Sequence, residues 1–187
     1  MVKKISIVVA IAENNAIGKE NKLLWHISAD MKRFKQITAE HTVIMGKNTF
    51  FSLPKRPLAN RRNIVISDDP GDSFPGCEMA YSIREAIGKC EPGRENFVIG
   101  GASVYRQFLP HAQKLYITRV HQSFDADTFF PEIRSGEWEI VEEENVMDDP
   151  QHDFAYSFLT YRRTEPRTKN QEPRSKIKEY RTKNKEY

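Results

Sequence analysis

Residues 5–12 read Ile-Ser-Ile-Val-Val-Ala-Ile-Ala, an almost unbroken apolar run near the start of the chain. The run is short and rich in β-branched residues, so it predicts a strand buried on both faces, at the centre of a parallel sheet. Lys3 and Lys4 before the run give it a superficial likeness to a secretory signal. The run is at the short end for such a signal, and we interpret it as the first, central strand.

Strand and helix patterns alternate from this run to residue 109, and only strand patterns follow. Further strands are predicted over 42–45, 63–66, 79–81, 97–99, 115–120, 138–146 and 154–161, the last two forming a hairpin. Helices are predicted from Ser28 to about residue 38, near Lys47, after the cap Ser82 and over 102–109. The sequence therefore predicts an α/β fold: one domain with a mostly parallel central sheet of about eight strands, closed by a C-terminal antiparallel hairpin, with helices on both faces.

The end of the chain has a different composition. TEPRTKN, QEPRSKI, KEYRTKN and KEY repeat every seven residues, but too few of these residues are apolar for a coiled-coil seam. We expect a folded domain over 1–163 and a disordered basic tail over 164–187. The tail holds eight Lys or Arg and four Glu, which leaves net −1 for the first 163 residues of a chain with net charge +3. The predicted domain thus has no basic bias that would favour nucleic acid.

Several classes of protein are disfavoured by missing patterns. No apolar run approaches the length that spans a bilayer, and no GxGxxG, Walker-type or GxSxG motif is present. The five histidines lack metal-ligand spacing, so we expect no metal site. Cys77 and Cys90 form no CxxC pair, which favours reduced thiols. We expect a monomeric cytoplasmic protein that binds a small molecule and neither membrane nor nucleic acid.

One carboxylate stands out, in the stretch LLWHISADMKRF at 23–34. Ser28 is a good helix N-cap, which places Asp30 in the first helical turn. Asp30 then shares a helix face with Met31 and Phe34. An acid on an apolar face is costly to bury unless a partner donates hydrogen bonds to it. A ligand could supply those donors, but this stretch by itself favours a solvated first-turn acid, because Asp is common at helix starts for structural reasons.

Three predicted strand-to-helix turns meet at the carboxyl edge of the sheet, where ligands of parallel sheets bind. Their sequences are Met-Gly-Lys-Asn-Thr at 45–49, Ile-Ser-Asp at 66–68 and Ile-Gly-Gly-Ala at 99–102. Each is weak evidence alone, because glycine after a strand is usually a turn device. Together, with a lysine at one of them, they indicate a nucleotide ligand about as strongly as a structural role.

The order of several short segments goes further, because together they resemble bacterial-type dihydrofolate reductase from residue 4 to about 163. The matching segments are AIG at 16–18, LW at 24–25, Asp30 with Phe34, VIMGKNTF at 43–50, Arg61 with NIVIS at 63–67, VIGGA at 98–102, Tyr105, LYIT at 115–118 and DTFFP at 127–131. The resemblance implies hydride transfer from the nicotinamide of NADPH to dihydrofolate, which gives tetrahydrofolate.

The resemblance also implies roles for catalytic residues. Asp30 would accept two N–H donors of the pterin, assisted by the Thr118 hydroxyl. A water admitted near Leu23 and Trp25 would deliver the proton, and Tyr105 would lie near the path of the hydride. Residues 13–24 would form a lid over the nicotinamide.

Two further sets of residues follow from the resemblance as binding residues. The rings of the substrate would contact Val8, Val9, Met31, Phe34, Leu53 and Ile99, and Arg61, helped by Arg56, would clamp the glutamate carboxylate. The cofactor would contact Ala10, Ile17, Gly18, Lys47, Asn48, Thr49, Ser67, Asp68, Gly100, Gly101, Ala102, Ser103, Val104, Tyr105 and Gln107. Gly100 and Gly101 stand where the family has a cis peptide bond.

Some positions depart from the family pattern. Leu24 replaces a proline that usually precedes the tryptophan. Asp68 stands where a small hydroxyl residue often meets the 2′-phosphate of NADPH, and Ser103 stands where an arginine is common. Both changes weaken the expected preference for NADPH over NADH, because Asp68 would repel the phosphate and Ser103 has no charge to bind it. Two rival functions also stay open: a pyrimidine reductase of riboflavin synthesis with the same fold, and a non-catalytic binding module that uses the basic tail.

Overall fold

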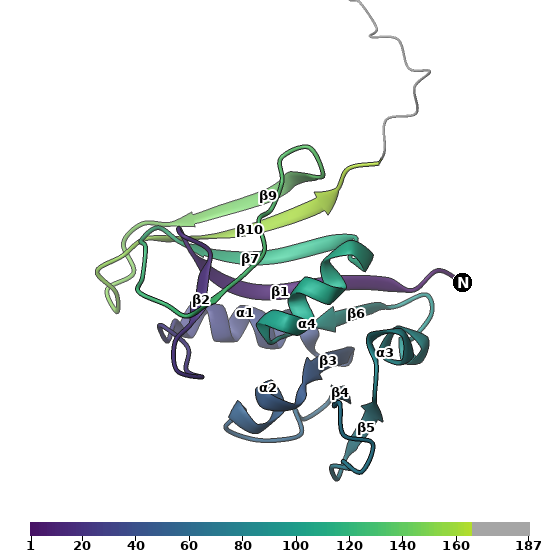
Figure 1. Cartoon of the computed structure of the whole chain (residues 1–187). Coiled ribbons are helices and arrows are strands. Elements are labelled where there is room, and N and C mark those ends of the chain that lie inside the picture. The colour runs from purple at the N-terminus through teal and green to yellow at the C-terminus, as the bar shows by residue number, and fades with distance from the viewer. Residues whose placement is uncertain (166–187) are drawn as a thin grey trace, which may run out of the picture.

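The computed structural model describes residues 1–165 of the 187-residue chain, and its centre is an eight-stranded sheet (Figure 1). The strand order is β5-β4-β3-β6-β1-β7-β10-β9. The bounds are β1 (Lys4–Ala12), β3 (Thr42–Gly46), β4 (Arg62–Ile66), β5 (Cys77–Ala80), β6 (Glu95–Val98), β7 (Lys114–Val120), β9 (Trp138–Val146) and β10 (Tyr156–Arg163).

The pairing within this sheet confirms the predicted architecture. β1 pairs in parallel with β6 on one side and β7 on the other, so the apolar run that starts at Ile5 is a central strand. The parallel part continues through β3, β4 and β5. β10 runs antiparallel to both β7 and β9, which makes the C-terminal hairpin the closing edge. All of this matches an α/β fold with a mostly parallel sheet.

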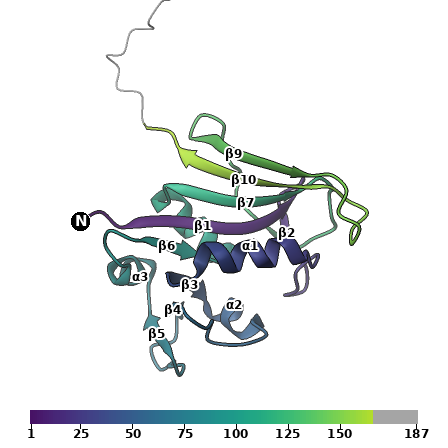
Figure 2. The same ribbon diagram turned by 180° about the vertical axis from the view of Figure 1, so that it is seen from behind.

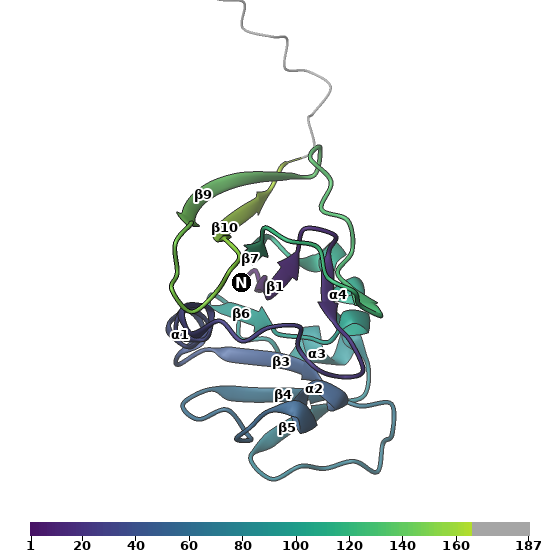
Figure 3. The same cartoon turned by 90° about the vertical axis from the view of Figure 1, so that its left-hand side faces the viewer.

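Helices cover both faces of the sheet, as predicted (Figures 2 and 3). They are α1 (Ser28–Thr38), α2 (Lys47–Ser52), α3 (Ile83–Lys89) and α4 (Ala102–Phe108), and the 3-10 turn η1 (Leu109–His111) follows α4. Figure 3 shows α1 on one side of the sheet and α3 and α4 on the other. One cluster of apolar side chains lies under α3 and α4 and includes Ile7 and Phe108. A second cluster lies on the α1 side and includes Val43 and Phe97.

Several local predictions need correction, including the strands predicted over 97–99 and 154–161, which span Glu95–Val98 and Tyr156–Arg163. Ser28 is the first residue of α1 rather than its N-cap: Ile27 holds that position with extended dihedrals, and no side chain caps the helix. The segment 13–24 is not all loop, because β2 (Ala16–Gly18) pairs with β8 (Thr128–Phe129). The strand predicted over 79–81 begins two residues earlier, at Cys77, and ends at Ala80.

Of the predicted tail, only residues 164 and 165 belong to the part of the chain that is described. Thr164 donates its backbone N–H to the carbonyl of Glu137 at 2.9 Å and its hydroxyl to the carbonyl of Gly136 at 2.9 Å. Thr164 therefore still belongs to the folded edge of the sheet. The expectation for 166–187 concerns residues outside the described range. Among residues 1–165, no helix is long and apolar enough to cross a membrane.

Candidate active site

The carboxylate of Asp30 meets the hydroxyl of Thr118 across the space between α1 and β7. Thr118 donates to Asp30 Oδ1 at 2.5 Å. Asp30 lies in the first turn of α1, and Thr118 is a buried residue of β7 that pairs with Ala10 of β1. Successive strand residues point to opposite faces, so Thr118 shares its face with Tyr116 while Ile117 points to the α4 side. The packing of α1 on that face brings the two residues together.

Burial dominates the electrostatics of Asp30. It raises the pKa of the Asp30 carboxyl above its usual range, and the bond from Thr118 and the charge of Arg33 oppose this only in part. Within the described residues, the one hydrogen bond to this carboxylate engages Oδ1. Oδ2 and a second lone pair on Oδ1 are therefore available to a ligand with two adjacent donors. This separates Asp30 from an ordinary solvated first-turn acid.

Phe34 and Arg61 lie together one turn further along α1. The guanidinium carbon of Arg61 is 5.8 Å from the centre of the Phe34 ring. Nε of Arg61 is buried and has no hydrogen-bond partner among the described residues. A buried donor without a partner is costly, so this cation is suited to an anionic ligand. Met31, on the same helix face, is 45% exposed.

Arg56 does not point to the same place as Arg61. Its guanidinium donates to the carbonyl of Phe51 at 2.9 Å and lies 5.1 Å from the centre of the Phe51 ring. The structure thus ties Arg56 to the end of α2, whereas Arg61 lies beside α1. The two cations that the resemblance grouped into one clamp have different surroundings.

The apolar residues predicted to contact the substrate rings lie on both faces of the sheet. Val8, Leu53 and Ile99 pack together on the α1 side of the sheet, against the cluster that contains Met45 and Phe50. Val9 belongs to the cluster on the α4 side, because neighbouring residues of β1 alternate between the faces. The prediction that the Val9 side chain joins the others is therefore wrong, and only its backbone can border the Asp30 side.

The two catalytic candidates in the segment before α1, Leu23 and Trp25, have different surroundings. Leu23 is 77% exposed, whereas the ring of Trp25 packs at 5.1 Å from that of Phe124. On the far side of β1, Ile17 and Tyr105 lie in one buried cluster, and Tyr105 donates its hydroxyl to the carbonyl of Val8 at 2.9 Å. Burial raises the pKa of Tyr105, so its hydroxyl stays protonated and serves as a donor.

The carboxyl ends of β3, β4, β5 and β6 surround a hollow of about 470 Å³. Gly46 donates its N–H to the carbonyl of Gly100 at 2.8 Å, and a Cβ at Gly46 would lie 3.1 Å from Val104 Cγ2. Close packing at this point thus favours glycine. The Gly100–Gly101 peptide bond is cis, as the resemblance implied.

Most predicted cofactor-binding residues line this hollow. They are Lys47, Asn48, Thr49, Ser67, Asp68, Gly101, Ala102, Ser103, Val104 and Gln107. Gly18 and Ala10 lie elsewhere, near β2 and on β1. Tyr81, Ser82 and Ile83 also line the hollow and were not among the predicted site residues. They follow β5, so the rule that ligands bind at the carboxyl ends of parallel strands could have indicated them.

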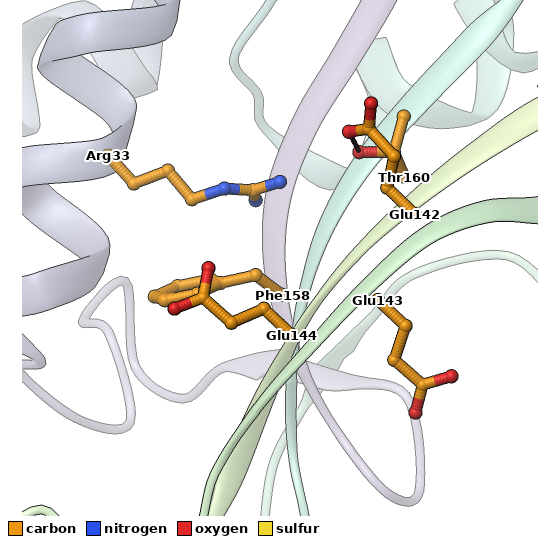
Figure 4. A pocket seen from close by; sticks show the side chains of 6 residues that line it. All are labelled: Arg33, Glu142, Glu143, Glu144, Phe158 and Thr160. Carbon is orange, nitrogen blue, oxygen red and sulfur yellow. Dashed lines mark hydrogen bonds between the residues drawn. The ribbon is translucent and has the colours of Figure 1, made fainter.

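A second cavity, of about 300 Å³, lies between α1 and the β9–β10 hairpin (Figure 4). Its lining residues are Arg33, Glu142, Glu143, Glu144, Phe158 and Thr160. The guanidinium of Arg33 is 4.8 Å from the centre of the Phe158 ring, and in Figure 4 the carboxylate of Glu143 points away from it. None of the candidate site residues lines this cavity.

No group of three or more His, Cys, Asp or Glu that could hold a metal ion occurs in residues 1–165. Cys77 and Cys90 are both free thiols. The site combines one half-buried carboxylate, one cation with a donor that has no partner among residues 1–165, and a hollow lined by turns.

Comparisons with known proteins agree with this geometry. The sequence model described as dihydrofolate reductase matches residues 4–163. The dihydrofolate reductase of Bacillus subtilis is 40% identical over 159 residues, which cover 85% of this chain and 94% of the relative. That of Staphylococcus haemolyticus is 38% identical over 160 residues, or 86% of this chain and 96% of the relative. A solved structure of the Enterococcus faecalis enzyme, complexed with NADP(H) and RAB-propyl, has a TM-score of 0.79 and 34% identity over 87% of this chain and 97% of that one.

Proposed function

Since this chain belongs to the dihydrofolate reductase family and reduces 7,8-dihydrofolate to tetrahydrofolate with NADPH, we propose that Asp30 is the residue that holds and polarises the substrate. The bond from Thr118 and the burial of the carboxylate are the observations that support this role. The pterin presents a ring N–H beside an amino group, and an ionised carboxylate accepts both as a charge-assisted pair.

The raised pKa of Asp30 has a functional meaning in this scheme. A carboxylate held away from water interacts strongly with the donors of the ring, because few solvent dipoles screen it. Asp30 thereby increases the basicity of the bound pterin without contacting the atom that is protonated. Thr118 fixes the orientation of the carboxylate and supports the same amino group through water.

Proton delivery comes from water admitted beside Leu23. The exposure of Leu23, at 77%, supports a position at the mouth of the site, whereas Trp25 is anchored on Phe124. NADPH supplies the hydride that reaches C6 of the substrate. No nucleophile is needed, which fits the lack of a nucleophile motif.

Arg61 binds the α-carboxylate of the substrate's glutamate tail. Its buried, unpartnered Nε and its position over Phe34 support this role, since a carboxylate would satisfy the donor. Phe34, Val8, Leu53 and Ile99 line the path between Asp30 and Arg61. Arg56 contributes less, because it is bound to the end of α2.

The hollow at the carboxyl edge binds the adenosine phosphates of the cofactor. Hydroxyls, backbone groups and one lysine line it, and these residue types fit a nucleotide. Ala10, Ile17, Gly18, Gly100 and Tyr105 form the nicotinamide half, and the segment 13–24 closes over it.

We also propose that the chain is a cytoplasmic monomer with one folded domain over 1–163, to whose edge Thr164 is also bound. The free thiols of Cys77 and Cys90 support a reducing compartment. The edge strand β9 carries exposed glutamates at 139 and 142–144, which oppose pairing with a second sheet. Size-exclusion chromatography with light scattering tests the monomer: a dimer mass would contradict it.

The deciding assay follows NADPH absorbance with dihydrofolate and, in parallel, with the aminopyrimidine substrate of riboflavin synthesis. We expect turnover with dihydrofolate alone. Turnover of the pyrimidine only would favour the rival reductase, and no turnover of either would favour a binding module. The Trp25–Asp30 pair and Arg61 are features that the pyrimidine reductase would not need.

A further inference from the structure

Lys47 is the one Lys or Arg among the described residues that line the hollow at the carboxyl edge. Its ammonium group already forms an ion pair with the carboxylate of Asp72. We propose that Asp72 determines cofactor specificity in this enzyme: it competes with the 2′-phosphate of NADPH for Lys47 and Ser67, and so weakens the preference for NADPH over NADH. The inference rests on the proposed placement of the adenosine phosphates in this hollow.

The geometry of the three residues supports this competition. Lys47 Nζ lies 2.7 Å from Asp72 Oδ2, and the Ser67 hydroxyl donates to the same oxygen. The side chain of Asp72 is only 17% exposed. The pair raises the pKa of Lys47 and lowers that of Asp72, so both groups are charged at neutral pH. The Ser67 hydroxyl has one hydrogen to donate, so a phosphate can accept it only by displacing Asp72. The Lys47 ammonium keeps other N–H donors, but its charge is already paired with Asp72.

The turn after β4 holds Asp72 in this position. Asp69 donates its N–H to Ser67 Oγ at 3.1 Å, and Asp69 Oδ1 accepts the N–H of Gly71 at 2.8 Å. Asp72 then donates its N–H to the carbonyl of Asp69 at 3.1 Å, and the Tyr81 hydroxyl donates to the carbonyl of Asp72 at 2.9 Å. The chain from Ser67 to Asp72 is thus folded back, which makes Asp72 a built-in partner of Lys47.

The balance of charge at the hollow points the same way. Asp68 lines it, and the negative charges of Asp72, Asp69 and Asp68 all act on Lys47, its one cation among the described residues. A monoester phosphate carries between about −1.5 and −2 at neutral pH. NADH lacks this group and avoids the repulsion, whereas NADPH must meet it. Selection for the 2′-phosphate usually needs a cation that is free to bind it.

The test compares wild type with Asp72→Asn in the full-length enzyme. The KM of each cofactor is measured with saturating dihydrofolate. We expect the KM for NADPH to fall roughly three- to fivefold, the range of one exposed ion pair, and the KM for NADH to change less than twofold. Glu78→Gln is the matched control, because it removes one charge from the ion pair between Arg62 of β4 and Glu78 of β5, neither of which lines the hollow. An unchanged NADPH-to-NADH ratio of kcat/KM in Asp72→Asn overturns the inference.

Two further experiments separate a failure of the proposed cofactor placement from a failure of the proposed role of Asp72. Lys47→Ala should raise the KM for NADPH; if it changes neither KM, the placement of the cofactor is wrong and the inference falls with it. If Lys47→Ala has its effect but Asp72→Asn has none, only the role of Asp72 fails. If Asp72→Asn does not fold, calorimetry on the wild-type enzyme tests the same competition through the affinities of two nucleotides. Adenosine 2′,5′-bisphosphate should bind at most about fivefold more tightly than adenosine 5′-monophosphate, and a much larger difference contradicts the competition.

Discussion

Replacement of Asp30 by asparagine separates the charge of this side chain from its shape. Asparagine fills the same space and can still accept the hydrogen bond that Thr118 donates to Asp30 Oδ1. It cannot accept two donors from a pterin, because its amide nitrogen is itself a donor. We therefore expect Asp30→Asn to fold normally and to lose most of its turnover at neutral pH.

The magnitude follows from the groups that lose their partner. One charge-assisted hydrogen bond, worth about 1.5–3 kcal/mol, disappears, and one buried donor of the substrate is left unsatisfied at about 1–3 kcal/mol. A combined loss of about 2.5–6 kcal/mol lowers kcat/KM roughly 10²- to 10⁴-fold. Acid conditions should restore part of the activity, because solution then supplies the protonated pterin that Asp30 otherwise favours.

The same substitution should stabilise the free enzyme. Burial raises the pKa of Asp30, so its ionisation costs folding free energy once the pH exceeds the unfolded value, near 3.9. The asparagine of the variant has no charge to bury, so the melting temperature of the variant should exceed that of wild type at neutral pH. This advantage should disappear in acid, where Asp30 is protonated in wild type as well.

The assay measures kcat/KM for dihydrofolate from about pH 5 to about pH 9, with thermal unfolding in the same buffers. Asp148→Asn is the control, since Asp148 is an exposed acid of the β9–β10 turn. Near-normal turnover of Asp30→Asn at neutral pH, or a pH profile that matches wild type, would refute the role of the carboxylate. A folded variant with lower stability than wild type at neutral pH would refute the account of its burial.

Three further predictions follow from the site and the chain end. Thr118→Val removes the hydrogen bond that lowers the pKa of Asp30. The acid limb of the pH profile of kcat/KM should therefore move to higher pH while substrate still binds. An unmoved limb would mean that the hydroxyl does not act on Asp30. Arg61→Ala should raise the KM for dihydrofolate roughly tenfold or more with little change in kcat, since one charge-assisted pair is lost. Arg56→Ala should change this KM less than about threefold. Equal effects of the two variants would show that both cations bind the same carboxylate. Truncation after Glu165 keeps the contacts of Thr164 and should leave kcat, KM and melting temperature unchanged, and a loss of turnover would assign a catalytic need to the tail.

The fold class and the central strand of this protein could be predicted from the order of its residues. The run that starts at Ile5 is apolar without alternation, and only a strand covered on both faces satisfies that pattern. Alternating strand and helix patterns and the final hairpin then led to the observed sheet. Predictions of single elements failed where neighbouring residues are compatible with more than one structure. Ser28 is a residue type that often caps helices but lies inside α1. The short strand around Ile17 lies within a polar segment that is typical of a loop.

Which candidates act together became clear only from the folded arrangement. Asp30 and Thr118 are 88 residues apart in the chain, and only the packing of α1 on the sheet makes them partners. The alternation of β1 sends Val8 and Val9 to opposite faces, a distinction that needs the register of the sheet rather than the composition of the strand. The pairing of Lys47 with Asp72 depends on how the turn after β4 folds back. Local sequence specifies the elements, but contacts between distant elements follow from packing, which no short segment encodes.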